Sequence, residues 1–484
     1  MRQRHNLLIP LLAISLLTFA ILFREKSVPL LRYNIAHNSL LQLIPNSLDP
    51  LKANDTNTQF VINHLYDGLV KWSLEKGIEP MLAQRWEFSD NKKSIFFDLN
   101  RNVVFSDGSL ITAQEIVKCL RRVIESPNYF KDHFKNIQSV QVVSDTRIKI
   151  DLKNTDPKIL FILSGTPALI TKIDKKGNFL SSGPFTVEKK QENLISIRAR
   201  KNYYGLKPTT EFINFKKISA NDISKMIQNN EIDDAIIDSS PNIKVRTNND
   251  SWSTINMWAT WGIGFDTRNE VAKSKKLRIR LANAFKTSIF VPEIFPYQQL
   301  AYGLIPFGLP GSLTEPPPSD NKIKYFNHDL NNIKILEIFI PREVPQKDLI
   351  ITWLHKYASK TKINYKIVEE SFANIILNLG TGKMGAFLLS FNAEYPSPYF
   401  YLDSVLSKGP SNYFGSDSKV INDIALRFDP SKEPANNANI LKKINLYLVN
   451  EALFIPLMHI KHNAWMRNCV SGIEFTPLSE GYFS

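Results

Sequence analysis

The segment from Pro80 to Arg121 constrains the fold more than any other part of the chain. Trp86–Phe88 and Ser94–Leu99 alternate large apolar and polar residues around a Ser-Asp-Asn-Lys turn, which predicts two strands. Asp107-Gly108 predicts a tight turn, and a capping box that begins at Thr112 predicts the start of a helix. This order of strand, strand and helix contains no nucleophile, metal cluster or phosphate loop. The segment is therefore scaffold.

The same segment resembles a family signature, and further motifs of that family occur in order along the chain. Its patterns P-x-L-A-x-x-W and F-x-D-G-x-x-x-T-A-x-[DE]-[IV] are those of the family 5 extracellular solute-binding proteins, which feed ABC importers. The ordered series is far more specific than any single motif. The other segments that are similar to family motifs are Ser47–Pro50, His64–Leu69, Ser182–Phe185, Arg200–Pro208, Gly262–Thr267 and Ala393–Pro398.

The resemblance implies an α/β, two-lobe periplasmic-binding-protein fold of type II, with an extra subdomain. The lobes would be joined by two chain crossovers, and the ligand would be enclosed in the cleft between them. The larger lobe is expected to comprise residues 30–262 plus 456–484, with the inserted subdomain at about 45–175. The second lobe is expected to comprise residues 263–455.

Residue patterns without the resemblance predict only a mixed α/β protein of two or three domains. Ile333–Ile340, Lys347–Ser359 and Ile363–Ile367 follow a strand, helix, strand order, which favours a parallel pair with a covering helix. Leu277–Ile289 predicts a helix. Three consecutive prolines within Leu309–Asp320 predict an extended linker.

The amino terminus resembles an export signal. Arg2, Arg4 and His5 precede an apolar run from Leu7 to Phe23, so residues 1–29 are expected to be a secretory signal peptide or an N-terminal anchor. Export with cleavage is favoured, which predicts a periplasmic protein. The apolar run is at the lower limit for spanning a bilayer, so anchorage to the inner membrane is the alternative.

Charge and cysteine content argue against several classes of function. The 60 Lys and Arg against 46 Asp and Glu give a net charge of +14, but the basic residues are scattered singly or in pairs, so no nucleic acid is expected as a partner. Cys119 and Cys469 could form one disulfide bond, but two cysteines do not make a disulfide framework. His459 and His462 would face opposite sides of a strand, so no metal site is expected. No catalytic constellation stands out, and neither enzymatic activity nor a cofactor is expected.

Five residues are candidates for the ligand site. The resemblance places Glu394 where the oligopeptide-binding members carry an Asp that pairs with the ammonium of the peptide; the alternative is an exposed loop carboxylate. Phe391 takes the place of a Trp that packs against ligand in several relatives, although a strand Phe is more often core. The strand that ends at Asn392 could bind an extended peptide through its main chain. Trp258 and Trp261, beside the first crossover, could line the cleft.

The expected function is that of an exported, monomeric solute-binding protein, which captures a dipeptide or oligopeptide and delivers it to the membrane permease of an ABC importer. Closure would occur about the crossovers near 258–266 and 450–457. One alternative is a nickel-chelate or other small-solute binder of the same fold. Another is a membrane-anchored binding or sensing protein that transports nothing. Asp266, Glu394 and Ser397 depart from the family pattern, which leaves the ligand class open.

Overall fold

The computed structural model describes most of the chain between Ala36 and Phe483. The predicted signal or anchor, Leu7–Phe23, lies outside the described residues. The described residues are 36–41, 44–53, 55–73, 75–128, 130–156, 158–217, 222–238, 251–285, 287–317, 334–393, 397–403, 405–406, 412–416, 419–425, 427, 437–468, 470, 473–475, 477–478 and 481–483.

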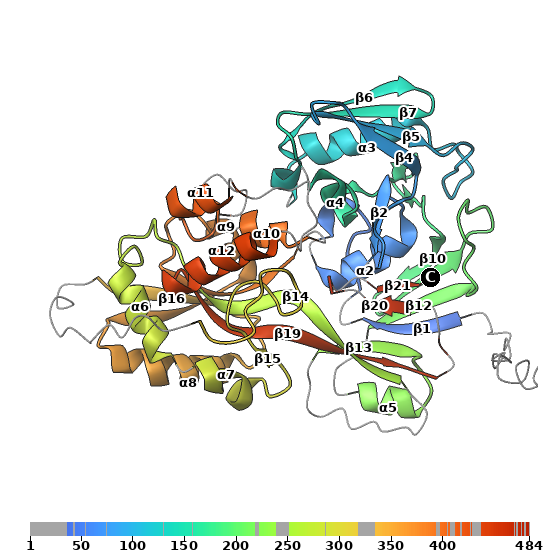
Figure 1. The fold of residues 1–484 in the computed structure, drawn as a ribbon. Coiled ribbons are helices and arrows are strands. Elements are labelled where there is room, and N and C mark those ends of the chain that lie inside the picture. Colours follow the sequence, from blue (N-terminus) through green and yellow to red (C-terminus); the bar gives the residue numbers. More distant parts are fainter. Residues whose placement is uncertain are drawn as a thin grey trace, which may run out of the picture.

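One large mixed sheet runs through the molecule (Figure 1). Its strand order is β10-β11-β12-β1-β13-β19-β14-β18-β16-β17, and β15 pairs with β19 outside this path. The strands are β1 (Ala36–Leu41), β10 (Phe185–Gln191), β11 (Leu194–Ala199), β12 (Phe212–Lys217), β13 (Asp234–Asp238), β14 (Ser251–Phe265), β15 (Gln299–Leu300), β16 (Leu336–Pro341), β17 (Tyr365–Glu370), β18 (Ala386–Asn392) and β19 (Phe454–Met466).

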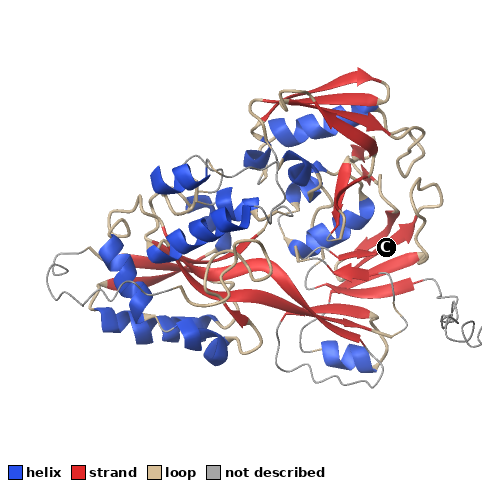
Figure 2. Cartoon of the chain, in the orientation of Figure 1, coloured by secondary structure: helices blue, strands red, loops and turns tan. Residues whose placement is uncertain are grey.

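Two long antiparallel strands, β14 and β19, connect the halves of this sheet (Figure 2). The first half of β14, Ser251–Asn256, pairs with the end of β19, which also pairs with β13. The second half of β14, from Ala259, pairs with β18 on one side and with the start of β19 on the other. The chain therefore passes between the two halves of the sheet within these two strands.

Helices cover both faces of the half of the sheet that contains β16–β18. In Figure 1, α6 (Lys275–Ala284), α7 (Thr287–Ile294) and α8 (Lys347–Ala358) lie on one face. The other face carries α9 (Phe372–Asn378), α10 (Tyr399–Asp403), α11 (Lys419–Ala425) and α12 (Ala438–Asn450). Apolar residues of α6–α8 and of the sheet form one continuous buried cluster on the first face.

The segment that begins at Pro80 folds as predicted. It forms β4 (Ala83–Phe88), β5 (Ser94–Leu99) and α3 (Ala113–Glu125), and the Oγ1 atom of Thr112 accepts a hydrogen bond from the main-chain N–H of Glu115 at 3.3 Å. The strands β6 (Ile137–Ser144) and β7 (Arg147–Leu152) complete a separate sheet of order β4-β5-β7-β6. Alternate buried residues of its strands pack with the apolar face of α3.

The strand, helix, strand order in the second half of the chain is confirmed, since β16 and β17 pair in parallel and α8 lies between them in sequence. The helix predicted over Leu277–Ile289 is confirmed as far as Ala284 but does not continue unbroken, because α7 begins separately at Thr287. The α6 helix ends at Ala284 because Phe285 turns to an extended conformation and packs on Trp353, with ring centroids 5.2 Å apart. The linker predicted over Leu309–Asp320 lies partly outside the described residues.

The remaining elements are short. They are η1 (Pro50–Lys52), α2 (Thr56–Leu65), β2 (Val70–Ser73), β3 (Gly77–Pro80), η2 (Lys131–Phe134), α4 (Ile159–Leu163), η3 (Thr166–Ala168), β8 (Lys172–Ile173), β9 (Phe179–Leu180), α5 (Ile223–Gln228), η4 (Ser359–Thr361), β20 (Ile473–Phe475) and β21 (Gly481–Phe483).

Two features bear on the sequence-based expectations about the membrane and the cysteines. Within the described residues, no helix has the length and apolar character needed to cross a bilayer. Cys119 is a free thiol whose Sγ lies 2.7 Å from the carbonyl oxygen of Thr171. Burial raises the pKa of that thiol to about 11. Cys469 lies outside the described residues.

A glycine in the crossing strand allows the close packing of this region. A Cβ atom added at Gly262 would collide with the ring of Phe454 and would lie 2.6 Å from the carbonyl oxygen of Ile455. We therefore expect Gly262→Ala to lower the free energy of unfolding by about 1–3 kcal/mol through overpacking. Equilibrium unfolding in urea measures the change.

Gly165→Ala is the matched control for that substitution. The nearest atom to its added Cβ would be 3.4 Å away, which is ordinary contact. This variant should differ from the wild type by no more than about 1 kcal/mol. Equal stability of the two alanine variants would show that the crossing strands are less tightly packed than described.

Candidate functional site

The pairing of β14 with β19 is interrupted at Trp258. The register of the ladder shifts between Asn256 and Thr260. Within this interruption, the carbonyl oxygen of Trp258 accepts hydrogen bonds from the N–H of Ala393 at 2.9 Å and from the hydroxyl of Tyr401 at 2.7 Å. The N–H of Trp258 donates to the carbonyl oxygen of Pro477 at 2.8 Å. Three segments that are distant in sequence therefore meet at one residue of the crossing strand.

One face of β14, the strand that crosses between the two halves, packs against a buried cluster that both halves share. Alternate residues of a strand share a face, so Thr260 lies on the same face as Gly262 and Gly264. The missing side chains of these two glycines would point at Phe454 and Phe387. Both phenylalanines belong to a buried cluster that also contains residues of β2, α3 and α4. The residues packed against this face of β14 therefore share one buried cluster with residues of β2, α10 and α12.

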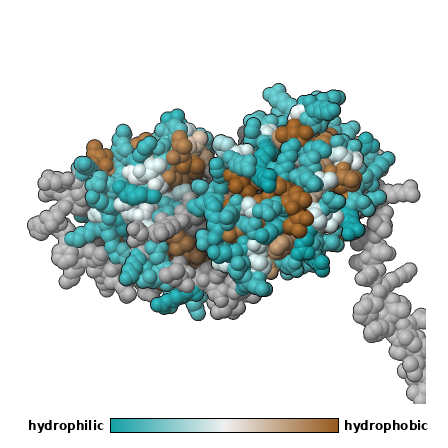
Figure 3. Space-filling model, turned by 90° about the horizontal axis from the view of Figure 1, so that it is seen from above, coloured by the Kyte–Doolittle hydropathy of each residue, from teal (hydrophilic) through white to brown (hydrophobic). Residues whose placement is uncertain are grey.

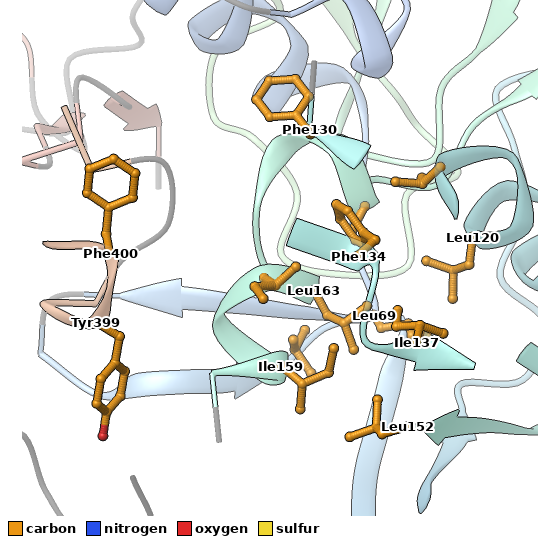
Figure 4. Packing of buried hydrophobic residues seen from close by; sticks show 14 of the residues in the cluster. Leu69, Leu120, Phe130, Phe134, Ile137, Leu152, Ile159, Leu163, Tyr399 and Phe400 are labelled. Carbon is orange, nitrogen blue, oxygen red and sulfur yellow. The ribbon is translucent and has the colours of Figure 1, made fainter. Parts of the chain in front are cut away.

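Trp72 of β2 provides the opposing surface. Its ring lies 5.5 Å from that of Trp258, at an interplanar angle of 59°, and both side chains are partly exposed. Nearby in the same cluster, Tyr399 and Phe400 of α10 come from one half of the chain, whereas Ile159 and the other labelled residues come from the opposite half (Figure 4). From above, the molecular outline narrows to a notch between the two parts, with apolar residues on both sides (Figure 3).

The edge of β18 is open beside this region. Ala386–Asn392 pairs along its whole length with β14, but β16 pairs only with Ala386 and Phe387. Alternate residues of an antiparallel strand direct their main-chain groups to opposite sides. The N–H of Ala393 points to β14, so Ser390 and Asn392 direct theirs away from it. Among the described strands, none pairs with this side of Ser390 and Asn392.

A buried polar pair spans the crossing strands next to Trp258. The Oγ1 atom of Thr260 lies 2.8 Å from Nδ1 of His459, which faces it across the ladder. Thr260 is fully buried and His459 is 4% exposed. Nε2 of His459 makes no hydrogen bond within the part of the chain that is described. Burial, helped by the charge of Lys461, lowers the pKa of His459 to about 4, so the imidazole is uncharged at neutral pH.

A second buried polar group fixes the approach to β2. Asp67 is fully buried, and its Oδ2 accepts hydrogen bonds from the hydroxyls of Tyr203 at 3.0 Å and Tyr204 at 2.8 Å. Its main-chain N–H donates to Oγ of Ser182 at 2.8 Å. Burial raises the pKa of Asp67 to about 6, against the opposing effect of the tyrosine hydroxyls and Arg200. These contacts hold the chain three residues before the strand that carries Trp72.

The predicted site residues fall in different surroundings. Phe391 is 3% exposed and packs against Phe414 and Phe454, with ring centroids 5.5 and 5.2 Å away. Trp261 lies on the other face of β14 from Thr260 and packs on Phe295 at 5.6 Å.

The structure brings together two of the predicted residues, because the pairing of β18 with β14 places Asn392 opposite Ala259, next to Trp258. The side chain of Asn392 is exposed, and its Oδ1 accepts a hydrogen bond from the hydroxyl of Ser390 at 2.5 Å. Glu394 lies outside the described residues. Ligand contact by all five residues stays a prediction.

Asp266, which departs from the family pattern, has a structural role. Its carboxylate accepts hydrogen bonds from Nε of Arg268 at 2.7 Å and from the N–H of Gly382 at 2.8 Å. Arg268 in turn donates to the carbonyl oxygen of Asn412 at 2.9 Å. The Asp266 carboxylate is therefore held by hydrogen bonds within the second half of the chain. The presence of Asp where the family has Asn thus has a structural explanation and gives no information about the ligand.

The sequence comparison identifies the family. Residues 77–413 match the bacterial extracellular solute-binding proteins, family 5 Middle, which is more than half of the chain. The chain is a family 5 solute-binding protein. It is therefore a solute-binding component of ABC transport, and the expected recognition is confirmed. A shorter match relates this binding protein to the glutathione-binding protein GsiB of Escherichia coli K12, at 27% identity over 199 residues. That match spans 38% of this chain and about two-fifths (39%) of GsiB.

Solved structures confirm the fold of the binding protein. The substrate-binding protein CtaP of Listeria monocytogenes is 18% identical, with a TM-score of 0.74 over 93% of this chain and 99% of its own. NikA of Brucella suis, in complex with Fe(III)-EDTA, is 18% identical, with a TM-score of 0.75 over 92% and 98%. DppA of Helicobacter pylori, in complex with the peptide STSA, is 15% identical, with a TM-score of 0.74 over 93% and 98%. The predicted type II, two-lobe α/β class is thereby confirmed.

Sequence reasoning missed Trp72, Thr260 and Asp67 as members of the region, and it considered His459 only as a metal ligand. No local signal separates Trp72 from any other aromatic residue of a strand. The described part of the binding protein contains no group of three or more His, Cys, Asp or Glu residues placed to hold a metal. The available clue was a polar residue within each of two largely buried strand segments, Thr260 in β14 and His459 in β19.

The raised pKa of Asp67 predicts a pH effect on stability. Below its usual pKa of 3.8 the carboxyl is protonated in both states, whereas between pH 4 and 6 only the folded state keeps the proton. Asp67 therefore lowers the free energy of unfolding as the pH rises through this window, by about 2–3 kcal/mol in total. Asp67→Asn should remove that decline, so the variant should gain stability relative to the wild type from pH 4 to 7.

The measurement is urea unfolding of both proteins at several pH values, compared by difference. The difference is needed because His64 and His459, whose pKa values are lowered to about 4, make stability rise with pH in the same range. Asp151→Asn is the control. Burial acts to raise the pKa of Asp151, but hydrogen bonds from Lys149 and two serines lower it overall. The stability that Asp151 contributes is therefore lost only as the pH falls below about 4, so Asp151→Asn should show no gain relative to the wild type as the pH rises from 4 to 7. Parallel profiles for wild type and Asp67→Asn would contradict the assignment.

Proposed function

We propose that this binding protein is exported, captures a short peptide between its two lobes and delivers it to the permease of an ABC importer. The observation that carries the peptide assignment is the open edge of β18. Ser390 and Asn392 direct main-chain N–H and C=O groups away from β14, to a side where none of the described strands pairs with them. An extended peptide satisfies such groups by adding as a further strand.

Recognition through main-chain groups suits a transporter of varied peptides. Every peptide carries the same N–H and C=O groups at the spacing of a strand, so affinity is independent of side chains. Trp258 lies at the end of β18, where its carbonyl oxygen binds Ala393, and it presents partly exposed aromatic surface together with Trp72. Such surface contacts apolar side chains without a directional requirement, which is compatible with a broad choice of ligands.

A charged contact would complete the site. Glu394 directly follows Ala393, whose N–H is bound to the carbonyl oxygen of Trp258. In our proposal its carboxylate pairs with the ammonium group of the peptide, because a cation taken out of water requires a counter-charge. Phe391 and Asn392 support the edge from the adjacent strand positions.

Closure would enclose the peptide. We propose lobes made of residues 30–262 plus 456–484 and of residues 263–455, which move about β14 and β19 where their ladder is interrupted. The peptide contacts both lobes only in the closed state, so its binding favours closure. The cleaved signal peptide within residues 1–29 would place the protein in the periplasm, and amino-terminal sequencing of the mature protein distinguishes this from a retained anchor.

The ligands of the solved relatives point to a second candidate class of solute for this fold. DppA of H. pylori is described with the peptide STSA and AppA of Bacillus subtilis with a nonapeptide, whereas NikA of B. suis is described with Fe(III)-EDTA, a metal chelate. The open strand edge favours a peptide over a chelate, because a chelate has no main chain to pair with it. Native mass spectrometry of the purified protein would reveal which class is retained.

Calorimetric titration with free and N-acetylated tripeptides tests the proposal. We expect the wild type to bind the free peptide and the variant Glu394→Gln to bind it with about 2–4 kcal/mol less binding free energy, the range for a broken buried ion pair. The acetylated peptide lacks the ammonium, so it should bind the wild type weakly and discriminate little between the two proteins.

Glu270→Gln is the matched control, since Glu270 is exposed and pairs with Lys273 on the surface at 2.7 Å. Its affinity for the free peptide should equal that of the wild type. Peptide binding that is unchanged in Glu394→Gln would remove the ammonium contact. Failure of the wild type to bind any peptide would refute the peptide assignment itself.

A further inference from the structure

We propose that His459 is a specificity-determining residue of the cleft, which donates a hydrogen bond from Nε2 to an oxygen atom of the bound solute. This inference rests on the proposed function and identifies a contact that the open strand edge and Glu394 do not supply. The chemical class of ligand group is a carbonyl or carboxylate oxygen. A peptide carries both.

The hydrogen bonds of Thr260 and His459 determine which ring nitrogen of His459 carries the proton. Among the described residues, the buried Thr260 side chain makes one hydrogen bond, to Nδ1 of His459 at 2.8 Å. If the threonine hydroxyl donates to Nδ1, the proton of the neutral ring is on Nε2, and one buried donor is left without a partner. If Nδ1 donates instead, both the threonine O–H and Nε2 are left unsatisfied. Since each unsatisfied buried group costs free energy, the first arrangement is the stable one.

The position of the ring makes a ligand the natural partner for Nε2–H. Thr260 lies on the face of β14 that packs against the buried cluster shared by both halves, and it pairs with Phe391 on one side and with His459 on the other. Phe391, a predicted ligand contact, therefore lies in the same row of paired residues as Thr260 and His459. Trp258, whose ring meets Trp72 of the opposite side, is two residues away. The unpartnered donor thus lies at the point where the two halves of the molecule meet.

A second feature argues against a purely structural role. A polar pair that served only the core would be expected to satisfy all of its groups, since buried polar atoms in folded proteins are almost always bonded. His459 is 96% removed from solvent, yet Nε2 has no partner among the described residues. A donor of this kind is prepared for an acceptor that arrives with the solute.

Two substitutions distinguish the roles of the two ring nitrogens of His459. His459→Asn places an amide where Nδ1 lies, so it keeps the bond to Thr260 and leaves the Nε2 position empty. His459→Gln extends an amide N–H to the Nε2 position. We expect His459→Asn to weaken binding of trialanine and of glutathione about tenfold or more, and His459→Gln to bind within about threefold of the wild type. Calorimetry gives the affinities, and thermal unfolding shows whether each variant is folded.

Imidazole nitrogen NMR of the wild type provides a measurement that needs no variant. The expected spectrum of free His459 is that of the neutral Nε2–H tautomer, with a shift of the Nε2 resonance on addition of the peptide. Equal peptide affinity of His459→Asn and wild type, a Nδ1–H tautomer, or an Nε2 resonance unmoved by bound peptide would overturn the proposal and leave peptide binding intact. Absence of peptide binding to the wild type would instead overturn the proposed function, and this proposal with it.

Discussion

The interrupted pairing of β14 with β19 is the feature on which the rest of the structure depends. Two strands that pair continuously would make one stiff sheet, whereas the register shift between Asn256 and Thr260 breaks the ladder at the point where the chain passes between its two halves. In this interval the main-chain groups of Trp258 are bound by Ala393, Tyr401 and Pro477, and the bond from Ala393 continues the pairing of β14 with β18. Those bonds bring the end of β18 and the carboxyl-terminal segment to the same place. The candidate site lies where the pairing of the two crossing strands is interrupted.

The motifs that identify the family mostly maintain the scaffold. Asp67 accepts hydrogen bonds from Tyr203 and Tyr204, so two separate motifs meet in one buried cluster before β2. Asp266 closes a turn with Arg268. Gly183 allows close approach to α2, because a Cβ there would lie 2.8 Å from the main-chain carbon of Leu65. A family signature that is structural predicts the fold well and the ligand poorly, since the residues that contact a solute need not be part of it.

Sequence patterns predicted the elements whose cause is local, and failed where the cause is tertiary. Alternation and capping located β5 and the start of α3, and the strand, helix, strand order located the parallel pair β16 and β17. The predicted helix over Leu277–Ile289 is divided because Phe285 is drawn into the core against Trp353, which no local pattern records. The site is harder still. Thr260 and His459 are 199 residues apart in sequence, and only the pairing of the crossing strands makes them neighbours. Trp258 could be proposed because it lies beside the expected first crossover, and Asn392 because it ends a strand whose main chain could bind an extended peptide.

The central claim is that a peptide binds where the two halves meet and holds them together. Small-angle X-ray scattering of the purified protein, with and without a saturating short peptide, tests this most directly, because closure about the crossing strands changes the overall dimensions. The account predicts a smaller radius of gyration in the presence of peptide. An unchanged scattering profile, with binding verified in the same sample, would contradict it.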